Sequence, residues 1–370
     1  MSRRLRTILT QVGSFALAGL LLFLALRGLD LDEIGAALSD ANYLWLIPLV
    51  LVVLASHWLR AWRWVMLIEA LPPDERPVRR VTTAEAFGAV LIGYMVNYVA
   101  PRLGEVVRTA NLATRQKIGF SSLFGTVVVE RILDVVVLLL GLLSVVVLLR
   151  HRIEDLYLVF VEPLRLELGL VPMLLVGLGT LALFAAIFFI SRSYLRASTR
   201  ASAIWKRRIR PLASSFKAGL LTIVRSRRRT GLIVSTLAIW SCYALAAHMP
   251  FYLLNMVEPY QISLVDSWSI MLLGAVGVAL PSPGGTGTFH FITILVLTTF
   301  FDVARAPAAA YAVLTHGAQL VLYALSGFVA LLAQGSSVRT LARRTAAAQE
   351  SADGVERAAD SSSSSTRRAP

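Results

Sequence analysis

Charged residues occur at regular spacing inside stretches of the chain that are otherwise apolar. Arg102, Glu105 and Arg108 follow at intervals of three, so they share one face of any helix that contains them. Glu130 and Asp134 are four residues apart and share a face in the same way. A planar guanidinium group binds phosphate or carboxylate through two parallel hydrogen bonds. The pattern therefore predicts either phosphate binding by arginines that carboxylates hold in place, or ion pairs that only join two helices.

Three further arginines add to this charge. Arg60 and Arg63 belong to the tryptophan-rich segment 59–64, and Arg131 directly follows Glu130. A charge at the centre of a bilayer costs roughly 2.5–3.5 kcal/mol on insertion scales, so such a group normally has a partner or lines an aqueous path. For Arg60 and Arg63 two interpretations stay open: phosphate binding, or extension of both side chains to the membrane interface.

A second segment with binding potential is rich in glycine and proline and carries little charge. Its members are Pro281, Ser282, Pro283, Gly284, Gly285, Gly287 and His290. A glycine-rich turn that opens a helix offers backbone N–H groups and a positive dipole end to an anion. His316 and Gln319, from a later apolar stretch, can add hydrogen bonds. The alternative is a tight turn that packs against another turn, with histidines that only fill space.

No known catalytic arrangement stands out in the sequence. There is no H-E-x-x-H motif, no G-x-S-x-G motif and no Cys/His cluster. The single cysteine, Cys242, lies in an apolar run, so it forms no disulfide within the chain. We therefore expect a protein that is not an enzyme and that holds no metal or cofactor.

The composition indicates a membrane protein. Hydrophobic residues make up 56% of the 370 residues, and charged residues only 16%. The net charge is +14, which could indicate a nucleic-acid partner, but the apolar background favours a membrane with a basic cytoplasmic face. We expect membrane lipids with an anionic or phosphate-bearing headgroup as partners and no nucleic acid. A homo-oligomer and a separate lipid-modifying enzyme are further partners that the sequence leaves open.

The elements that position these residues are apolar runs long enough to cross a bilayer, which takes roughly 20 residues. Six such runs occur, at about 8–29, 43–68, 121–149, 170–191, 231–256 and 306–333. Segment 192–230 carries twelve lysines and arginines and no acid, so it is expected in the cytoplasm. Segment 30–40 is acidic and is expected outside. This orientation places both termini in the cytoplasm, in a multi-pass protein of a bacterial cytoplasmic membrane.

Two further apolar stretches, 82–117 and 262–301, are broken midway by proline and glycine. The orientation of the six spans requires each stretch to enter and leave on the same side, as a re-entrant helical hairpin. The predicted tips contain Pro101 and Gly104 in the first hairpin and Pro281 and Gly284 in the second, with Asn97 just before the first tip. Each hairpin lies between two spans, and the two groups have opposite orientation.

The predicted fold is therefore an all-α integral membrane bundle of about six spans and two oppositely oriented re-entrant hairpins. Inverted repeats with broken helices are a common plan of secondary transporters. The repeats are expected at about 43–149 and 231–333, within a transmembrane domain at 1–335. Residues 336–370 are rich in Ser, Ala and Arg and are expected to form a disordered cytoplasmic tail.

Four of these pieces, in this order, resemble the lysylphosphatidylglycerol synthase/flippase membrane-domain family. They are residues 59–64, residues 97–108, the group Glu130, Arg131 and Asp134, and residues 281–287. The resemblance covers about 40–335. It implies a helical membrane domain with re-entrant hairpins that moves lipids between leaflets. It also implies that the soluble aminoacyl-transfer domain of two-part synthases is absent, because nothing after Gln334 is expected to fold into one.

Together these observations predict a lipid flippase whose headgroup site lies in a polar cavity between the hairpins. A membrane transferase acting on a lipid phosphate or sugar-lipid is the main alternative, and a transporter of small ions or solutes is another. The residues do not identify the lipid, the direction of movement or the energy source.

Overall fold

The computed structural model describes residues 19–28, 30–73, 76–77, 79–99, 103–117, 119–150, 228–279 and 283–335. Within these ranges every regular element is helical. The elements are α2 (Leu31–Ser39), η1 (Tyr43–Trp45), α3 (Leu46–Glu69), α4 (Thr83–Val99), α5 (Gly104–Gln116), α6 (Phe120–Leu148), α12 (Arg229–Leu253), α13 (Val257–Tyr260), α14 (Leu264–Ala279), η5 (Pro283–Gly285), α15 (Thr288–Phe300) and α16 (Arg305–Ala333). Met1–Leu142 with Ser226–Pro370 form one compact unit, which contains the site, and Leu143–Arg225 form another.

Four helical segments of the described part are long and apolar enough to cross a membrane. They are Tyr43–Glu69, Phe120–Leu148, Arg229–Leu253 and Arg305–Ala333. They coincide with four of the predicted spans, so the chain is a multi-pass helical membrane protein. The predicted span 8–29 lies mostly outside the described residues. The predicted span 170–191, nearly all of the basic segment 192–230 and the tail 336–370 also lie outside them.

Each broken apolar stretch forms two helices that pack against each other. In the first pair, a Cβ at Gly93 would lie 3.0 Å from the Gly104 carbonyl oxygen and 3.2 Å from Cβ of Arg108. In the second pair, a Cβ at Gly277 would lie 2.9 Å from the Thr288 carbonyl oxygen. Residues before each break thus lie against residues just after it, so the two helices of a pair are antiparallel. We call α4 with α5 the first hairpin and α14 with α15 the second hairpin.

The two hairpins begin with the same type of helix cap. Before α4, the Thr82 backbone N–H donates to Glu85 Oε2 at 3.0 Å, and the Glu85 N–H donates to Thr82 Oγ1 at 3.3 Å. Before α14, the Ser263 N–H donates to Asp266 Oδ2 at 2.9 Å, and the Asp266 N–H donates to Ser263 Oγ at 3.2 Å. Such a reciprocal cap satisfies N–H groups at the helix start that otherwise lack partners. It fixes where each hairpin starts.

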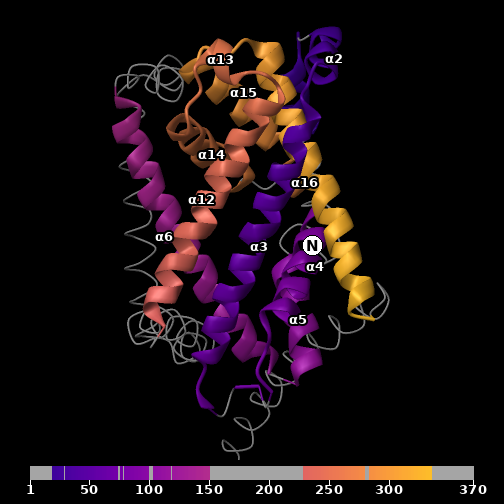
Figure 1. Ribbon diagram of the computed structural model, residues 1–370, viewed down its shortest axis with the longest axis vertical. Coiled ribbons are helices and arrows are strands. Elements are labelled where there is room, and N and C mark those ends of the chain that lie inside the picture. Colours follow the sequence, from indigo (N-terminus) through magenta and orange to yellow (C-terminus); the bar gives the residue numbers. More distant parts are fainter. Residues whose placement is uncertain are drawn as a thin grey trace, which may run out of the picture. The chain divides into compact units, whose positions relative to one another are not determined.

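The hairpins pack among the long helices (Figure 1). Helix α3 packs along α12, and α4 lies between α3 and α16. Helix α14 packs against α12, and α15 packs against α16. At Gly327 of α16, an added Cβ would meet the Met95 side chain and lie 2.8 Å from the Leu91 carbonyl oxygen of α4. The absence of a side chain at Gly327 thus allows α16 to approach the first hairpin closely.

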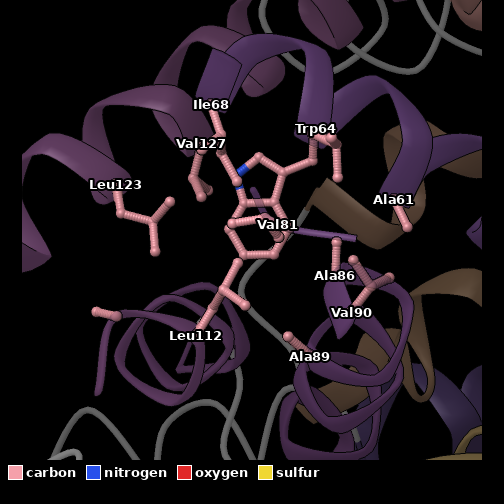
Figure 2. Packing of buried hydrophobic residues seen from close by; sticks show 12 residues of the cluster. Ala61, Trp64, Ile68, Val81, Ala86, Ala89, Val90, Leu112, Leu123 and Val127 are labelled. Atoms are coloured by element: carbon pink, nitrogen blue, oxygen red, sulfur yellow. The ribbon is translucent and has the colours of Figure 1, made fainter. Parts of the chain in front are cut away.

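An apolar core joins α3, the first hairpin and α6. Trp64 is fully buried at its centre, and the other buried members are Ala61, Val65, Ile68, Val81, Ala86, Ala89, Val90, Leu112, Ala113, Leu123 and Val127. Figure 2 shows the Trp64 ring surrounded by side chains from all of these elements. Transfer of a large aromatic side chain from water to a protein interior contributes about 1.5–3 kcal/mol to stability. This core holds α3, α4, α5 and α6 in place at one end of the charged residues.

Candidate functional site

Five buried or nearly buried charged side chains from three helices form one cluster. They are Arg60 and Arg63 of α3, Arg108 of α5, and Glu130 and Asp134 of α6, and we call them the charged cluster. Arg60 Nη1 lies 2.5 Å from Glu130 Oε1 and 2.9 Å from Asp134 Oδ2. Arg108 Nη2 lies 3.1 Å from the same Glu130 oxygen. Glu130 therefore joins α3 to the first hairpin, and the i, i+4 spacing lets both acids reach one guanidinium group.

The second arginine of α3 completes the link to α12. Arg63 Nη2 lies 2.6 Å from Asp134 Oδ1, and Arg63 Nη1 donates to Thr236 Oγ1 at 3.1 Å. Arg60 Nη2 donates to the Tyr243 hydroxyl at 2.6 Å. Thr236 and Tyr243 both belong to α12, so α3, α5, α6 and α12 meet at the charged cluster.

The charged cluster rests on the tryptophan core. The guanidinium carbon of Arg108 lies 4.9 Å from the centre of the Trp64 ring, in a cation–π arrangement. The Trp64 indole N–H donates to Thr126 Oγ1 at 2.8 Å, which fixes the ring against α6. The core therefore sets the position of the Arg108 guanidinium group as well as supporting the fold.

A second ion pair borders the charged cluster on its more exposed side. Arg131 Nη2 lies 2.6 Å from Glu105 Oε1, and Arg131 Nη1 lies 3.7 Å from Asp134 Oδ2. The Arg131 side chain is 42% exposed and that of Glu105 23% exposed. Glu105 and Arg108 thus both face α6, as their spacing of three predicts.

The charges of this region do not balance. Among the residues that the structure describes, four guanidinium groups face three carboxylates, which leaves one positive charge in excess. Several buried polar atoms also lack a hydrogen-bond partner among the described residues. They are Glu130 Oε2 and the Nε atoms of Arg60, Arg63 and Arg108. Because buried polar groups are normally satisfied, such atoms call for an explanation. The excess positive charge favours an additional anion, whereas the unpartnered Glu130 oxygen needs a hydrogen-bond donor.

One of the two interpretations of Arg60 and Arg63 is wrong. The side chains are 3% and 0% exposed and bind acids of α6, so they do not extend to an interface. Because their surroundings are apolar, these guanidinium groups form ion pairs with buried carboxylates instead of extending to the membrane interface. Asn97 has a structural contact: its Oδ1 accepts a hydrogen bond from the Gly104 N–H at 2.8 Å and so closes the first hairpin.

The second hairpin places glycines and histidines together. Gly284, Gly285 and Gly287 have φ values of 58°, 78° and 81°, a conformation that glycine adopts without strain. Gly285 and Gly287 are buried. His316 Nε2 lies 3.3 Å from Thr286 Oγ1, and the His316 ring centre lies 4.9 Å from that of His290. Both histidines are nearly buried, and Gln319 is half-buried one turn further along α16.

A series of ring contacts runs from the α3 face that carries Arg60 to the histidines at the second hairpin. The sequence alone did not predict these contacts. His57 lies beside Tyr94 and Tyr323, with ring centres 4.2 and 5.1 Å away. Tyr98 lies 5.7 Å from Tyr323 and 5.7 Å from His316. The spacing of His57 three residues before Arg60 places it on the same helix face and was a usable signal. The tyrosines sit in apolar segments, where an aromatic residue ordinarily indicates packing alone.

The described residues do not include every predicted site residue. Arg102, Pro101, Pro281 and Ser282 lie outside them, and the side chain of Pro283 does too. Their assignment to a substrate site stays a prediction. No group of three or more His, Cys, Asp or Glu side chains that could hold a metal ion occurs in the described part of the chain.

The sequence matches a known family model over most of its length. The model describes the lysylphosphatidylglycerol synthase TM region and matches residues 11–327. The chain belongs to this family. The expected family is thereby confirmed, and the described charged cluster and both hairpins lie within the matched residues 11–327.

The chain is also distantly similar to a protein with a described function. A protein of Haloferax volcanii described as Glycosyltransferase AglD is 23% identical over 364 residues, an alignment that covers 93% of this chain. The alignment spans only 57% of the length of that relative. No solved structure matches this chain.

Proposed function

We propose that this chain moves a phosphate-bearing lipid between the leaflets of a bacterial cytoplasmic membrane. The lipid is a phospholipid, an aminoacyl-lipid or a polyprenyl-linked lipid. Its headgroup passes through a polar path between the hairpins while its tails stay in the bilayer. The protein itself carries out no covalent chemistry in this proposal.

The charged cluster carries the proposal. Its excess positive charge, and Nε–H groups that lack a partner among the described residues, lie where α5 meets three helices that are apolar enough to span a membrane. Arg108 is the best phosphate ligand of the group. Its Nη2 contacts Glu130 and Trp64 holds its guanidinium plane, while its Nε has no partner among the described residues. The competing explanation is that the ion pairs only lock the first hairpin to α3 and α6. A guanidinium group that only locks helices has no role in lipid specificity.

The hairpins supply the second part of the argument. Each consists of two short antiparallel helices, and each lies between long apolar helices, as in transporters with re-entrant segments. A Cβ at Gly284 of the second tip would lie 3.1 Å from Cδ1 of Tyr98 at the end of α4. The second tip therefore lies beside the end of α4. We propose that both hairpins are re-entrant, from opposite sides, and that the headgroup passes where they meet.

A reconstitution experiment tests the proposal. The purified chain is inserted into vesicles that contain a phospholipid with a fluorescent headgroup label, and a membrane-impermeant quencher reports how much label reaches the outer leaflet. Wild-type protein should expose inner-leaflet lipid faster than protein-free vesicles. Replacing Arg108 by glutamine should lower the rate about tenfold, the equivalent of one charged hydrogen bond.

Arg115→Gln is the matched control. Arg115 lies on α5, like Arg108, but is exposed and donates to the Gln334 carbonyl oxygen. It should move lipid at the wild-type rate. Equal rates for wild-type protein and protein-free vesicles with every tested phospholipid would overturn the proposal.

The Haloferax relative favours a second candidate function, because its description names a glycosyltransferase. Under this alternative the chain is a membrane transferase that acts on a lipid phosphate or sugar-lipid. Purified chain given a polyprenyl phosphate and a sugar donor should then form a glycosylated lipid. Product formation that a Glu130→Gln variant abolishes would favour the transferase over the flippase.

A further inference from the structure

A cavity of about 210 Å³ is lined by residues that belong neither to the charged cluster nor to the hairpin tips. Residues from α3, from the segment that leads into α4 and from the start of α12 surround it. They are Trp62, Val65, Met66, Arg80, Val81, Thr82, Thr83 and Arg228. The volume is much larger than one water molecule needs, so the cavity has room for a polyatomic group such as a phosphate ester.

Two arginines of the cavity converge on one carboxylate. Arg80 Nε lies 2.8 Å from Glu69 Oε1, and Arg228 Nη1 lies 3.1 Å from Glu69 Oε2. The arginine side chains are 71% and 53% exposed, whereas Glu69 is 27% exposed. Glu69 therefore brings two guanidinium groups, from segments about 150 residues apart in the sequence, to the same cavity. A guanidinium pair of this kind suits the several oxygens of a phosphate.

The cavity lining also contains apolar side chains, namely Trp62, Val65, Met66 and Val81. Trp62 is 36% exposed, and Trp58, one turn earlier on α3, is 46% exposed. Val65, Met66 and Val81 are buried. Exposed tryptophans on a membrane-spanning helix concentrate at the level of the lipid headgroups. The cavity thus combines a cationic side with an apolar side at the depth where a lipid headgroup meets its chains.

We propose that this cavity binds the phosphate group of an anionic membrane lipid. The site is separate from the charged cluster, and it does not depend on whether the chain moves lipids. A soluble phosphate shares the same chemistry, but the tryptophan wall favours a phosphate that carries acyl chains. The ligand class is a phosphate monoester or diester of a glycerolipid.

A binding experiment on the full chain in a non-ionic detergent tests the site. Fluorescently labelled phosphatidic acid is titrated, and its anisotropy reports binding. Unlabelled phosphatidic acid, dioleoylglycerol and sodium phosphate serve as competitors. The double variant Arg80→Gln/Arg228→Gln should bind the labelled lipid about thirtyfold more weakly, given about 1 kcal/mol for each of the two basic residues near a membrane surface.

Two further variants separate a site from a general effect of charge. Arg76→Gln/Arg115→Gln removes the same charge from exposed positions outside the cavity and should keep wild-type affinity. Thr83→Trp fills the cavity without changing the charge and should weaken binding as the double variant does. Equal affinity of wild type and Arg80→Gln/Arg228→Gln would overturn the proposal, as would an equal loss in Arg76→Gln/Arg115→Gln.

The competitors identify the source of the phosphate. Competition by phosphatidic acid and none by dioleoylglycerol supports a lipid phosphate. Competition by sodium phosphate at the same concentration as phosphatidic acid overturns the lipid and assigns the cavity to a soluble phosphate. A negative result in this binding experiment does not overturn the proposed lipid transport, because the experiment measures no exchange of lipid between leaflets.

Discussion

The two hairpins share a plan but differ in the chemistry that attaches them to the rest of the protein. Both start with a reciprocal helix cap, and both bring their helices together at glycine. The first hairpin is joined to α3 and α6 through the ion pairs of Arg108 and Glu130. The second carries buried histidine and threonine side chains instead. One backbone arrangement therefore supports a charged face in one hairpin and a nearly uncharged face in the other.

This difference suggests a division of roles. Buried ion pairs cost desolvation free energy and hold their partners in one geometry. The glycine turn of the second hairpin, with its left-handed backbone, needs no such pairs. In our proposal the first hairpin therefore binds the headgroup, and the second closes the path from the opposite side.

The largest effect should come from removing a shared carboxylate. In Glu130→Gln, the guanidinium groups of Arg60 and Arg108 lose a buried counter-charge, so the free energy of unfolding should fall by about 3 kcal/mol. Thr293→Val of the second hairpin removes a buried hydroxyl that has no hydrogen-bond partner among the described residues, and the change should stay below about 1 kcal/mol. Chemical unfolding in mixed micelles measures both. Equal losses would remove the distinction between the hairpins.

The glycines should show where the hairpins behave alike. A Cβ at Gly104 would meet the Gly93 carbonyl oxygen, and a Cβ at Gly277 would lie 2.9 Å from the Thr288 carbonyl oxygen. Because backbone atoms cannot move away cheaply, Gly104→Ala and Gly277→Ala should each lower the unfolding free energy by about 1–3 kcal/mol.

Gly125→Ala is the control for the glycine variants. In the described part of the chain no neighbouring atom lies within 4 Å of an added Cβ at this helical position, so the variant should be as stable as wild type or slightly more stable. If Gly125→Ala proved as costly as Gly104→Ala, the contact explanation would be wrong.

The smallest effect concerns the cap of the first hairpin. Desolvation raises the pKa of Glu85, but hydrogen bonds from Thr82 and the ion pair with Arg79 outweigh it, so the pKa lies below the ordinary value of 4.5. A lowered folded-state pKa contributes stability above about pH 4.5 that is lost as the pH falls through the folded pKa. Glu85→Gln should therefore be less stable than wild type by up to about 1 kcal/mol at pH 7.

The same difference should shrink as the pH is lowered below the pKa of Glu85. Unfolding of wild type and Glu85→Gln at pH 7 and pH 3 measures this change. The control is Glu258→Gln, which removes an exposed acid of α13. A Glu85→Gln difference that stays constant with pH would show that the carboxylate charge contributes nothing to the cap.

Much of this architecture could be predicted from periodicity. Apolar length predicted the four long helices, and proline with glycine predicted both helix breaks. The i, i+3 and i, i+4 spacing of Glu105, Arg108, Glu130 and Asp134 predicted which charges share a face, because a helix repeats every 3.6 residues. Re-entry from opposite sides and the substrate site stay predictions.

The contacts between distant segments could not be predicted in this way. Arg60 binds Tyr243 across 183 positions of the sequence, and no local pattern marks that tyrosine. The cavity at Arg80 and Arg228 likewise depends on how α3, α4 and α12 pack. Helical periodicity specifies the face of a residue but not its partner helix.

The most direct measurement is lipid movement by Arg108→Lys in reconstituted vesicles. Lysine keeps the positive charge that Glu130 needs, but it lacks the planar fork that binds two phosphate oxygens. We predict an unfolding temperature close to that of wild type and a transfer rate about tenfold lower, the equivalent of one lost charged hydrogen bond. A folded Arg108→Lys protein that moves phospholipid at the wild-type rate would contradict a phosphate-binding role for the charged cluster.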